Sequence, residues 1–203
     1  MTALLPKADF ETVDVPNVPL ERLSWCRLAR VDQPDLIDWD GRPGATRFVP
    51  APTDFEVLYM AQRKRTAFWE VYAKRLLPLV KEDRVLPPAV LTERQWINFE
   101  VPVGLLVFDA TNIDHLRDIG GSNASFHGDW SASQAWAAAL WRHPQKIDGM
   151  LYRSDKDTPY VCLALFRRRG RDLLKKITAT PAGLLGEDTA FLQRLRKRGD
   201  LGA

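Results

Sequence analysis

The stretch Gly128-Asp129-Trp130-Ser131-Ala132-Ser133-Gln134 places a cluster of small polar residues directly before an apolar run. A Ser followed three residues later by a Gln is the pattern of a capping box, in which each side chain bonds the backbone N–H of the other residue. The pattern predicts a helix over residues 132–142. Free N–H groups and the positive end of the helix dipole also make such a turn an anion site, so the turn suits either a cap or a phosphate. Taken alone, capping is favoured, because Ser is a common N-cap residue.

Outward from this helix, strand-like and helix-like segments alternate without the regular period of a doubly wound sheet. We expect strands at residues 25–31, 47–49 and 57–61, a strand pair or one bent strand over 96–109, and a hairpin of 149–154 with 160–166. We expect helices at 66–77, 113–119 and about 188–197, with a flexible loop at 120–123. The pattern predicts an α+β fold, a mixed β-sheet with flanking helices.

Composition describes an ordinary soluble globular chain. The chain has 203 residues, of which 45% are hydrophobic and 27% charged, with a net charge of +3. One domain is the default at this length. Basic residues crowd into 167–176, which indicates a solvated face or, less readily, a phosphate-rich partner such as nucleic acid.

Targeting and redox signals are sparse. The first residues lack the pattern of a signal peptide, and no apolar segment reaches the length of a membrane span, so we expect a cytoplasmic protein without a membrane partner. Cys26 and Cys162 lie in apolar runs and are expected to be buried, reduced thiols. The three histidines are dispersed, which predicts no metal site.

Four polar residues stand out within apolar segments, namely Arg27, Arg47, Tyr59 and Glu70. Each also has an ordinary structural interpretation. The arginines suit edge positions that face water, and Tyr59 suits the core of a strand. Glu70 falls opposite the apolar stripe of the 66–77 helix, which by itself indicates a surface residue.

Seven short motifs follow one another along the chain, and their order is more specific than any one of them. They are Trp25-Cys26-Arg27-Leu28, Ala45-Thr46-Arg47-Phe48, Val57-Leu58-Tyr59-Met60-Ala61, Ala67-Phe68-Trp69-Glu70-Val71, the Ser131 turn, Asp148-Gly149-Met150-Leu151-Tyr152-Arg153-Ser154 and Val161-Cys162-Leu163-Ala164-Leu165-Phe166. In this order and spacing they resemble the RES domain, a bacterial family named for its Arg, Glu and Ser, whose members look like ADP-ribosyltransferases and degrade NAD. The resemblance is strongest over residues 22–166. It predicts a RES-like catalytic domain over 22–203, with an N-terminal extension over 1–21.

The resemblance implies a role for each polar residue. Glu70 would turn into a cleft, hold the ribose and stabilise the positive charge that grows on the anomeric carbon as nicotinamide leaves. Arg27 and Arg47 would hold the phosphates of NAD and an inorganic phosphate nucleophile, since a guanidinium fork binds phosphate bidentately. Tyr59 would stack on nicotinamide or touch the ribose. The family usually has Gly-Gly-Arg-Trp-Asn where this chain has residues 45–49, which leaves the backbone around Arg47 open.

The serines follow from the same resemblance. Ser131 would act through its hydroxyl at the helix N-terminus, with Gln134 beside it in the substrate-binding set. Ser154 matches a second family serine, although Asp155 follows it where many relatives have Arg. His127 lies next to the expected site, where a minor binding role is open.

Three functions are compatible with the sequence. The first is an enzyme that cleaves the nicotinamide–ribose bond of NAD, with phosphate or water as acceptor and no resident cofactor; relatives are often toxins, which implies a protein antitoxin as partner. The second is an ADP-ribosyltransferase that modifies a protein. The third is a non-catalytic module whose basic segment 167–176 contacts nucleic acid. The sequence leaves a homo-oligomer open.

Overall fold

The computed structural model describes residues 3–21, 24–127, 130–168 and 170–202, and its strands form one sheet. The strands are β1 (Val18–Pro19), β2 (Ser24–Arg30), β3 (Val57–Ala61), β4 (Arg94–Glu100), β5 (Leu106–Asp109), β6 (Gly149–Arg153), β7 (Val161–Phe166) and β8 (Thr178–Leu184). Their order across the 8-stranded sheet is β1-β5-β6-β7-β3-β2-β4-β8. Neighbouring strands are antiparallel except β5 and β6, which run parallel. The fold is α+β with a mixed sheet, as predicted.

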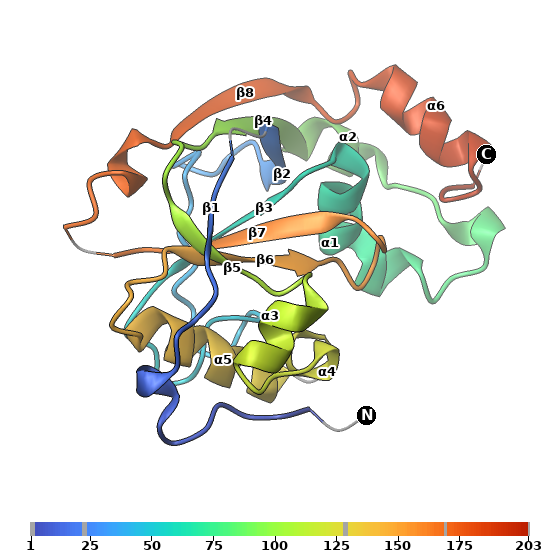
Figure 1. Cartoon of the computed structure of the whole chain (residues 1–203). Coiled ribbons are helices and arrows are strands. Elements are labelled where there is room, and N and C mark those ends of the chain that lie inside the picture. Colours follow the sequence, from blue (N-terminus) through green and yellow to red (C-terminus); the bar gives the residue numbers. More distant parts are fainter. Residues whose placement is uncertain (1–2, 22–23, 128–129, 169, 203) are drawn as a thin grey trace.

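Helices pack around this sheet in separate groups (Figure 1). They are α1 (Lys64–Leu76), α2 (Pro88–Glu93), α3 (Ile113–Asp118), α4 (Asn123–Phe126), α5 (Trp130–Arg142) and α6 (Thr189–Lys197), with single 3-10 turns at Phe10–Thr12, Lys81–Asp83 and Leu174–Lys176. In Figure 1, α3, α4 and α5 gather at one end of the molecule, whereas α6 follows β8 near the C-terminus. Among the described residues, no helix is both long and apolar enough to cross a membrane.

The central strand β7 is buried on both faces. Cys162, Ala164 and Phe166 belong to the core cluster shared with α1 and α5, and Leu163 and Leu165 belong to the cluster on the opposite face. This is the period-two alternation of a strand with a core on either side.

The N-terminal segment packs into the same core. The indole Nε1 of Trp136 donates to the carbonyl of Leu4 at 2.7 Å, and the ring of Phe10 packs edge-on against the Trp136 ring at 5.2 Å. Residues Val18–Pro19 add strand β1 to the edge of the sheet beside β5. The extension predicted over residues 1–21 therefore supplies part of the core, and its separation from the domain stays a prediction.

Several predicted elements are confirmed. Strand β3 has the predicted bounds, and β2, α1, α3 and α6 begin and end within two residues of the expected positions. The hairpin is also confirmed, because β6 and β7 pair antiparallel from Gly149–Leu165 to Arg153–Val161. Its strands approach closely at Gly149, where a Cβ would lie 2.3 Å from the carbonyl oxygen of Ala164. Both cysteines are free and buried, as expected.

Other predictions are wrong in instructive ways. Residues 47–49 are not a strand, since only an isolated bridge joins Thr46 to Val49. The segment 96–109 forms two strands, but β4 lies between β2 and β8 whereas β5 lies between β1 and β6. The turn between them contains Gly104 with a φ of 94°. The expected flexible loop at 120–123 leads directly into α4, which has its own capping box at Ser122 and Ser125.

The edge strand β8 was not expected, because it contains a proline and a glycine. Pro181 pairs with Ile97 at the edge of the sheet. A proline is tolerated in an edge strand, since its missing N–H is not needed by a further neighbour. The sequence pattern of this segment therefore does not predict the strand, which forms through its pairing with β4.

The basic segment 167–176 is not the simple solvated face that composition suggested. Arg171 donates from Nε and Nη2 to the two carboxylate oxygens of Asp148, each at 2.7 Å, and Asp148 is fully buried. Arg168 donates to the carbonyls of Trp141 and Ile147. These two cations therefore tie the chain after β7 to the end of α5 and the start of β6.

Candidate functional site

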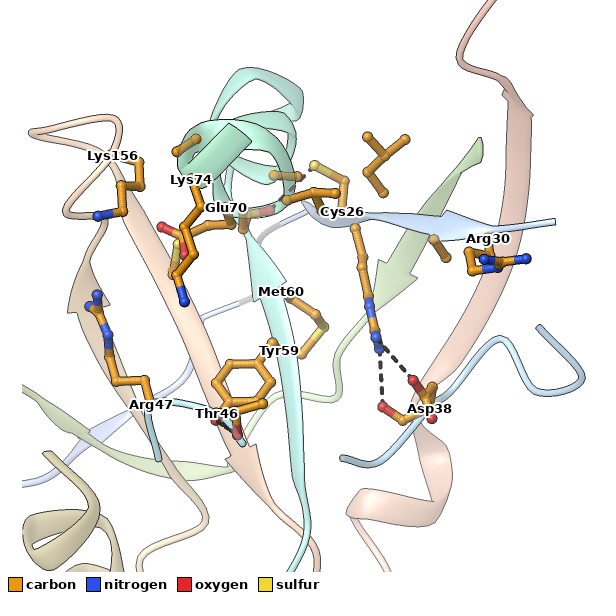
Figure 2. Close-up of a pocket in the computed structure, with 18 of the residues that line it drawn as sticks. Cys26, Arg30, Asp38, Thr46, Arg47, Tyr59, Met60, Glu70, Lys74 and Lys156 are labelled. Atoms are coloured by element: carbon orange, nitrogen blue, oxygen red, sulfur yellow. Dashed lines mark hydrogen bonds and ion pairs between the residues drawn. The ribbon is translucent and has the colours of Figure 1, made fainter. Parts of the chain in front are cut away.

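A cleft of about 680 Å³ opens beside the sheet, and residues from several separate parts of the chain line it (Figure 2). Its charged and polar residues include Arg27 of β2, Tyr59 of β3, Glu70 and Lys74 of α1, Arg47 of the loop before β3, Tyr152 of β6, and Asp155 and Lys156 of the β6–β7 turn. Four residues predicted from the sequence, Arg27, Arg47, Tyr59 and Glu70, thus line one cleft. They are separated in the sequence, and the sheet, α1 and the loop before β3 bring them to the same cleft.

Glu70 is held by a serine from the hairpin. The Ser154 hydroxyl donates to Glu70 Oε1 at 2.6 Å and accepts from the backbone N–H groups of Lys156 and Asp157, both at 3.1 Å. Because the two N–H groups occupy its lone pairs, the hydroxyl proton points at the carboxylate. Ser154 is 1% exposed, so it supports Glu70 from the protein side. The other carboxylate oxygen, Oε2, has no hydrogen bond to another described residue and remains available to a ligand.

Helix α1 explains the position of Glu70. The helix buries Phe68, Trp69 and Tyr72, and Pro78 follows shortly after its end. Glu70 lies on the exposed part of the helix, as its place on the helical wheel predicts, yet that part forms a wall of the cleft. The surface interpretation and the site interpretation of Glu70 are therefore compatible.

Arg47 is mostly buried and is paired with Asp155. Its side chain is 11% exposed, its Nη2 donates to Asp155 Oδ2, and its guanidinium lies 5.7 Å from the centre of the Tyr152 ring. The other carboxylate oxygen of Asp155 bonds His127 Nδ1 at 2.5 Å. Arg47 Nη1 is buried without a hydrogen-bond partner among the described residues. This N–H donor is therefore unsatisfied, in a residue that lines the cleft.

The electrostatics of Asp155 favour its charged form. Burial by itself would raise the pKa of the carboxyl, but the hydrogen bond with His127 and the charge of Arg47 outweigh burial and lower the pKa. The resemblance noted in the sequence leads to Arg at this position, whereas Asp155 here pairs with Arg47. The departure from the family pattern noted in the sequence therefore has a structural use.

A prediction about pH follows from that lowered pKa. The folded-state pKa of Asp155 lies below its unfolded value of about 3.9, so the pairing adds stability above that pH, which is lost as the pH falls through the folded-state pKa. The free energy of unfolding of wild type should exceed that of Asp155→Asn near neutral pH, and the gap should shrink below about pH 4. Chemical unfolding of both proteins across this range measures it. A gap independent of pH would contradict the assigned pairing.

Tyr59 organises the loop that carries Arg47. Its hydroxyl shares a hydrogen bond of 3.0 Å with Thr46 Oγ1 and accepts from the Phe48 N–H at 3.1 Å. Its ring stacks with the Phe48 ring, with centroids 6.2 Å apart. Burial raises the pKa of Tyr59, so the hydroxyl stays neutral. Tyr59 is therefore packed in the protein, as its place in a strand predicts, and it also lines the cleft.

Gln134 acts on the same loop, although it does not line the cleft. Its Nε2 donates to the carbonyl of Thr46 at 2.8 Å, which joins α5 to the Arg47 loop. Ser131 is exposed in the first turn of α5 and does not line the cleft either, whereas its neighbour Trp130 does. The predicted N-cap at Ser131 is wrong, because α5 begins at Trp130. Residues 128–129, which belong to the predicted anion-binding turn, lie outside the described residues.

Replacing Gln134 should loosen this link. We expect Gln134→Ala to lower the free energy of unfolding by about 1 kcal/mol, the net contribution of one hydrogen bond. The measurement is denaturant unfolding, with Gln193→Ala, an exposed position on α6, as the matched control. Equal stability of the two variants would show that the bond to Thr46 contributes nothing.

Arg27 lies in another part of the cleft. Its Nη1 donates to the carbonyl of Asp38 and its Nη2 to Asp38 Oδ2, both at 3.0 Å. In the view of Figure 2, Tyr59 and Met60 separate Asp38 from Arg47. The structure thus brings both arginines into the cleft but not together. One cation lies near Glu70 and the other lies farther along.

Lys74 was missed by the sequence analysis, although its spacing carries a signal. It follows Glu70 by four residues, the spacing of a helical ion pair. No ion pair joins the two residues; Lys74 Nζ lies instead 4.5 Å from the centre of the Trp130 ring. Figure 2 shows the nitrogen ends of Lys74, Arg47 and Lys156 directed toward the space beside Glu70. The region therefore combines the carboxylates of Glu70 and Asp155 with several cations.

Cysteine and metal chemistry have little support in the described residues. Burial raises the pKa of Cys26 to about 12 and raises that of Cys162 further, so both thiols stay neutral although they line the cleft. Within those residues, no group of three His, Cys, Asp or Glu is arranged to hold a metal ion.

Comparisons with known proteins bear on the family and the fold of the chain. The sequence model of the RES domain matches residues 24–186. A solved structure, the MbcT–MbcA toxin–antitoxin complex of M. tuberculosis, contains a chain similar in fold, with a TM-score of 0.63, 18% sequence identity, and coverage of 94% of this chain and 98% of that chain. A comparison with curated proteins gives no match.

Proposed function

The chain belongs to the RES domain family, and from this premise we propose that it cleaves the nicotinamide–ribose bond of NAD. The ADP-ribose passes to inorganic phosphate or, more slowly, to water. NAD is the substrate and no resident cofactor is required. The observation that carries the proposal is the Glu70 carboxylate, which Ser154 orients while Oε2 remains open to the cleft.

Glu70 acts on the transition state. The C–N bond breaks with its electron pair going to the pyridinium nitrogen, so nicotinamide leaves neutral and positive charge develops on the ribose ring. A carboxylate beside the anomeric carbon stabilises this oxocarbenium-like state by charge and holds the ribose hydroxyls. A phosphate oxygen then forms the new bond to the anomeric carbon; with water, the proton of the attacking molecule goes to solvent. Ser154 is a positioning residue in this scheme, because its hydroxyl contacts Glu70.

The cations account for binding. NAD carries two phosphate groups, and the acceptor phosphate is also an anion. Arg47 offers its unpartnered Nη1, and Lys74 and Lys156 add two ammonium groups to the same part of the cleft. Arg27, fixed by Asp38, adds a guanidinium farther along. Charge-assisted bonds from these groups would hold the phosphates while leaving the ribose at Glu70.

We further propose that the protein is the toxin of a toxin–antitoxin pair in the cytoplasm, where NAD is available. The likeness to a chain of a toxin–antitoxin complex supports this idea through the fold. A protein antitoxin that covers the cleft would prevent loss of NAD in the producing cell. Expression of the chain alone should therefore arrest growth, and co-expression with the neighbouring reading frame should relieve the arrest.

The experiment that tests the reaction is incubation of the purified protein with NAD, with and without phosphate, followed by mass spectrometry of small molecules and of the protein. We expect nicotinamide in both cases and a phosphorylated ADP-ribose only with phosphate. A mass increase of a protein by ADP-ribose, without free product, would favour the transferase alternative. Intact NAD in all reactions would refute the proposal.

Salt dependence separates this reaction from nucleic-acid binding. We expect NAD turnover to change little between about 50 and about 200 mM salt, whereas a protein with several phosphate contacts loses about 10³-fold or more in nucleic-acid affinity over this range. Initial rates and fluorescence binding to labelled DNA and RNA measure the two effects. Tight nucleic-acid binding at physiological salt, together with stable NAD, would favour the binding-module alternative, although Arg168 and Arg171 of its basic segment are engaged in structural bonds.

A further inference from the structure

A second pocket of about 230 Å³ lies between the start of α1 and helix α6, and it shares no lining residue with the cleft. Its lining is dominated by cations: three consecutive basic residues at 63–65, together with Arg194 of α6 and Arg198, which directly follows this helix. Tyr160, directly before β7, closes one wall. Neither the family motifs nor the proposed reaction uses these residues.

Carboxylates compensate only part of this charge. Lys64 Nζ bonds Asp188 at 2.6 Å, and Arg65 bonds both Asp157 and Asp200. Arg63, Arg194 and Arg198 form no ion pair with any described residue, although the charge of Arg194 contributes to the lowered pKa of Asp188. Three guanidinium groups therefore remain around one small concave space.

The arrangement of these arginines suits the binding of an anion. Arg63 stacks on the Tyr160 ring, with its guanidinium carbon 4.0 Å from the ring centre. Stacking on a ring restrains a guanidinium while leaving its in-plane N–H donors free. Arg194 lies in the last turn of α6, and Arg198 follows the end of the helix four residues later, at a spacing where like charges repel. A bound anion would relieve that repulsion.

We propose that this pocket binds the pyrophosphate group of a small phosphorylated ligand. Phosphate oxygens match the paired donors of guanidinium groups, and two adjacent phosphates supply enough negative charge for three arginines. The pocket lies below the range of 300–1,000 Å³ typical of sites that enclose a whole drug-sized ligand. It therefore takes the anionic group and leaves the rest of the ligand at the surface.

Isothermal titration calorimetry with inorganic pyrophosphate at fixed ionic strength tests the proposal. This measurement does not depend on any turnover of NAD. The variants are Arg194→Gln/Arg198→Gln for the pocket, Arg196→Gln as a matched control on the same helix outside the lining, and Arg47→Gln for the cleft. Losing a charge-assisted bond costs about tenfold in affinity, so the double variant should bind about 100-fold more weakly. Arg196→Gln should bind like wild type, and Arg47→Gln should retain the pocket site.

Four results would overturn the proposal. They are the absence of saturable binding to wild type, loss of all binding in Arg47→Gln, equal weakening in Arg196→Gln and the double variant, and tighter binding of hexaglutamate than of pyrophosphate at the same residues. The last result would assign the pocket to an acidic peptide. Thermal unfolding verifies the fold of each variant. If the double variant does not fold, Arg63→Gln, which leaves α6 unchanged, should weaken pyrophosphate about tenfold by itself.

Discussion

Glu70→Gln should reduce NAD turnover by about 100-fold or more while leaving the fold intact. The substitution keeps the size of the side chain and its ability to accept a hydrogen bond from Ser154, but it removes the negative charge that stabilises the ribosyl cation. Because Glu70 is exposed to the cleft, its replacement should change the free energy of unfolding by no more than about 0.5 kcal/mol. Initial rates and denaturant unfolding, measured on the same preparation, separate the two effects.

Two further variants sharpen this result. Glu11→Gln changes an exposed carboxylate outside the cleft and should leave the rate unchanged. Ser154→Ala should reduce the rate less than Glu70→Gln does, because the carboxylate keeps its charge and loses only its orientation. Growth arrest on expression should also disappear with Glu70→Gln. Wild-type turnover by this variant would remove Glu70 from the mechanism and most of the proposed reaction with it.

The local pattern of the sequence was enough to predict the elements that present the site. Strand β3 and helix α1 have clear apolar periodicity, and the β6–β7 hairpin is bounded by a polar turn. The conformation of these elements depends mainly on residues that are close together in the sequence. The α+β class follows from the same patterns, and the ordered motifs contain Glu70, Arg47, Arg27 and Tyr59, which all line the cleft.

The contacts that organise those residues could not be predicted in the same way. Arg47 and Asp155 are far apart in the sequence, and their pairing depends on how the irregular loop before β3 packs against the hairpin turn. Pairing of Glu70 with Lys74 would have been expected from helical spacing, but Trp130 of another helix holds the lysine. The N-cap expected at Ser131 failed for a smaller reason. The helix simply begins at Trp130, which changes the role of every residue in its first turn.

Arg47→Lys should raise the KM for NAD by about tenfold or more, although the positive charge is conserved. The planar fork of Arg47 bonds Asp155 through Nη2 and leaves Nη1 for a substrate phosphate, whereas a lysine has a single nitrogen for both tasks. The stacking distance of 5.7 Å to Tyr152 also depends on the guanidinium plane. Steady-state kinetics with NAD as the varied substrate measures the effect.

Arg117→Lys is the matched control and should behave like wild type, because Arg117 is 71% exposed and pairs with Asp114 outside the cleft. Arg27→Lys tests the other arginine in the same assay. A rise in the KM of this variant would indicate that Arg27, which bonds Asp38, also contacts a phosphate of NAD. An unchanged KM in Arg47→Lys would mean that Arg47 only supports the hairpin turn through Asp155, and that Lys74 and Lys156 bind the phosphate without it.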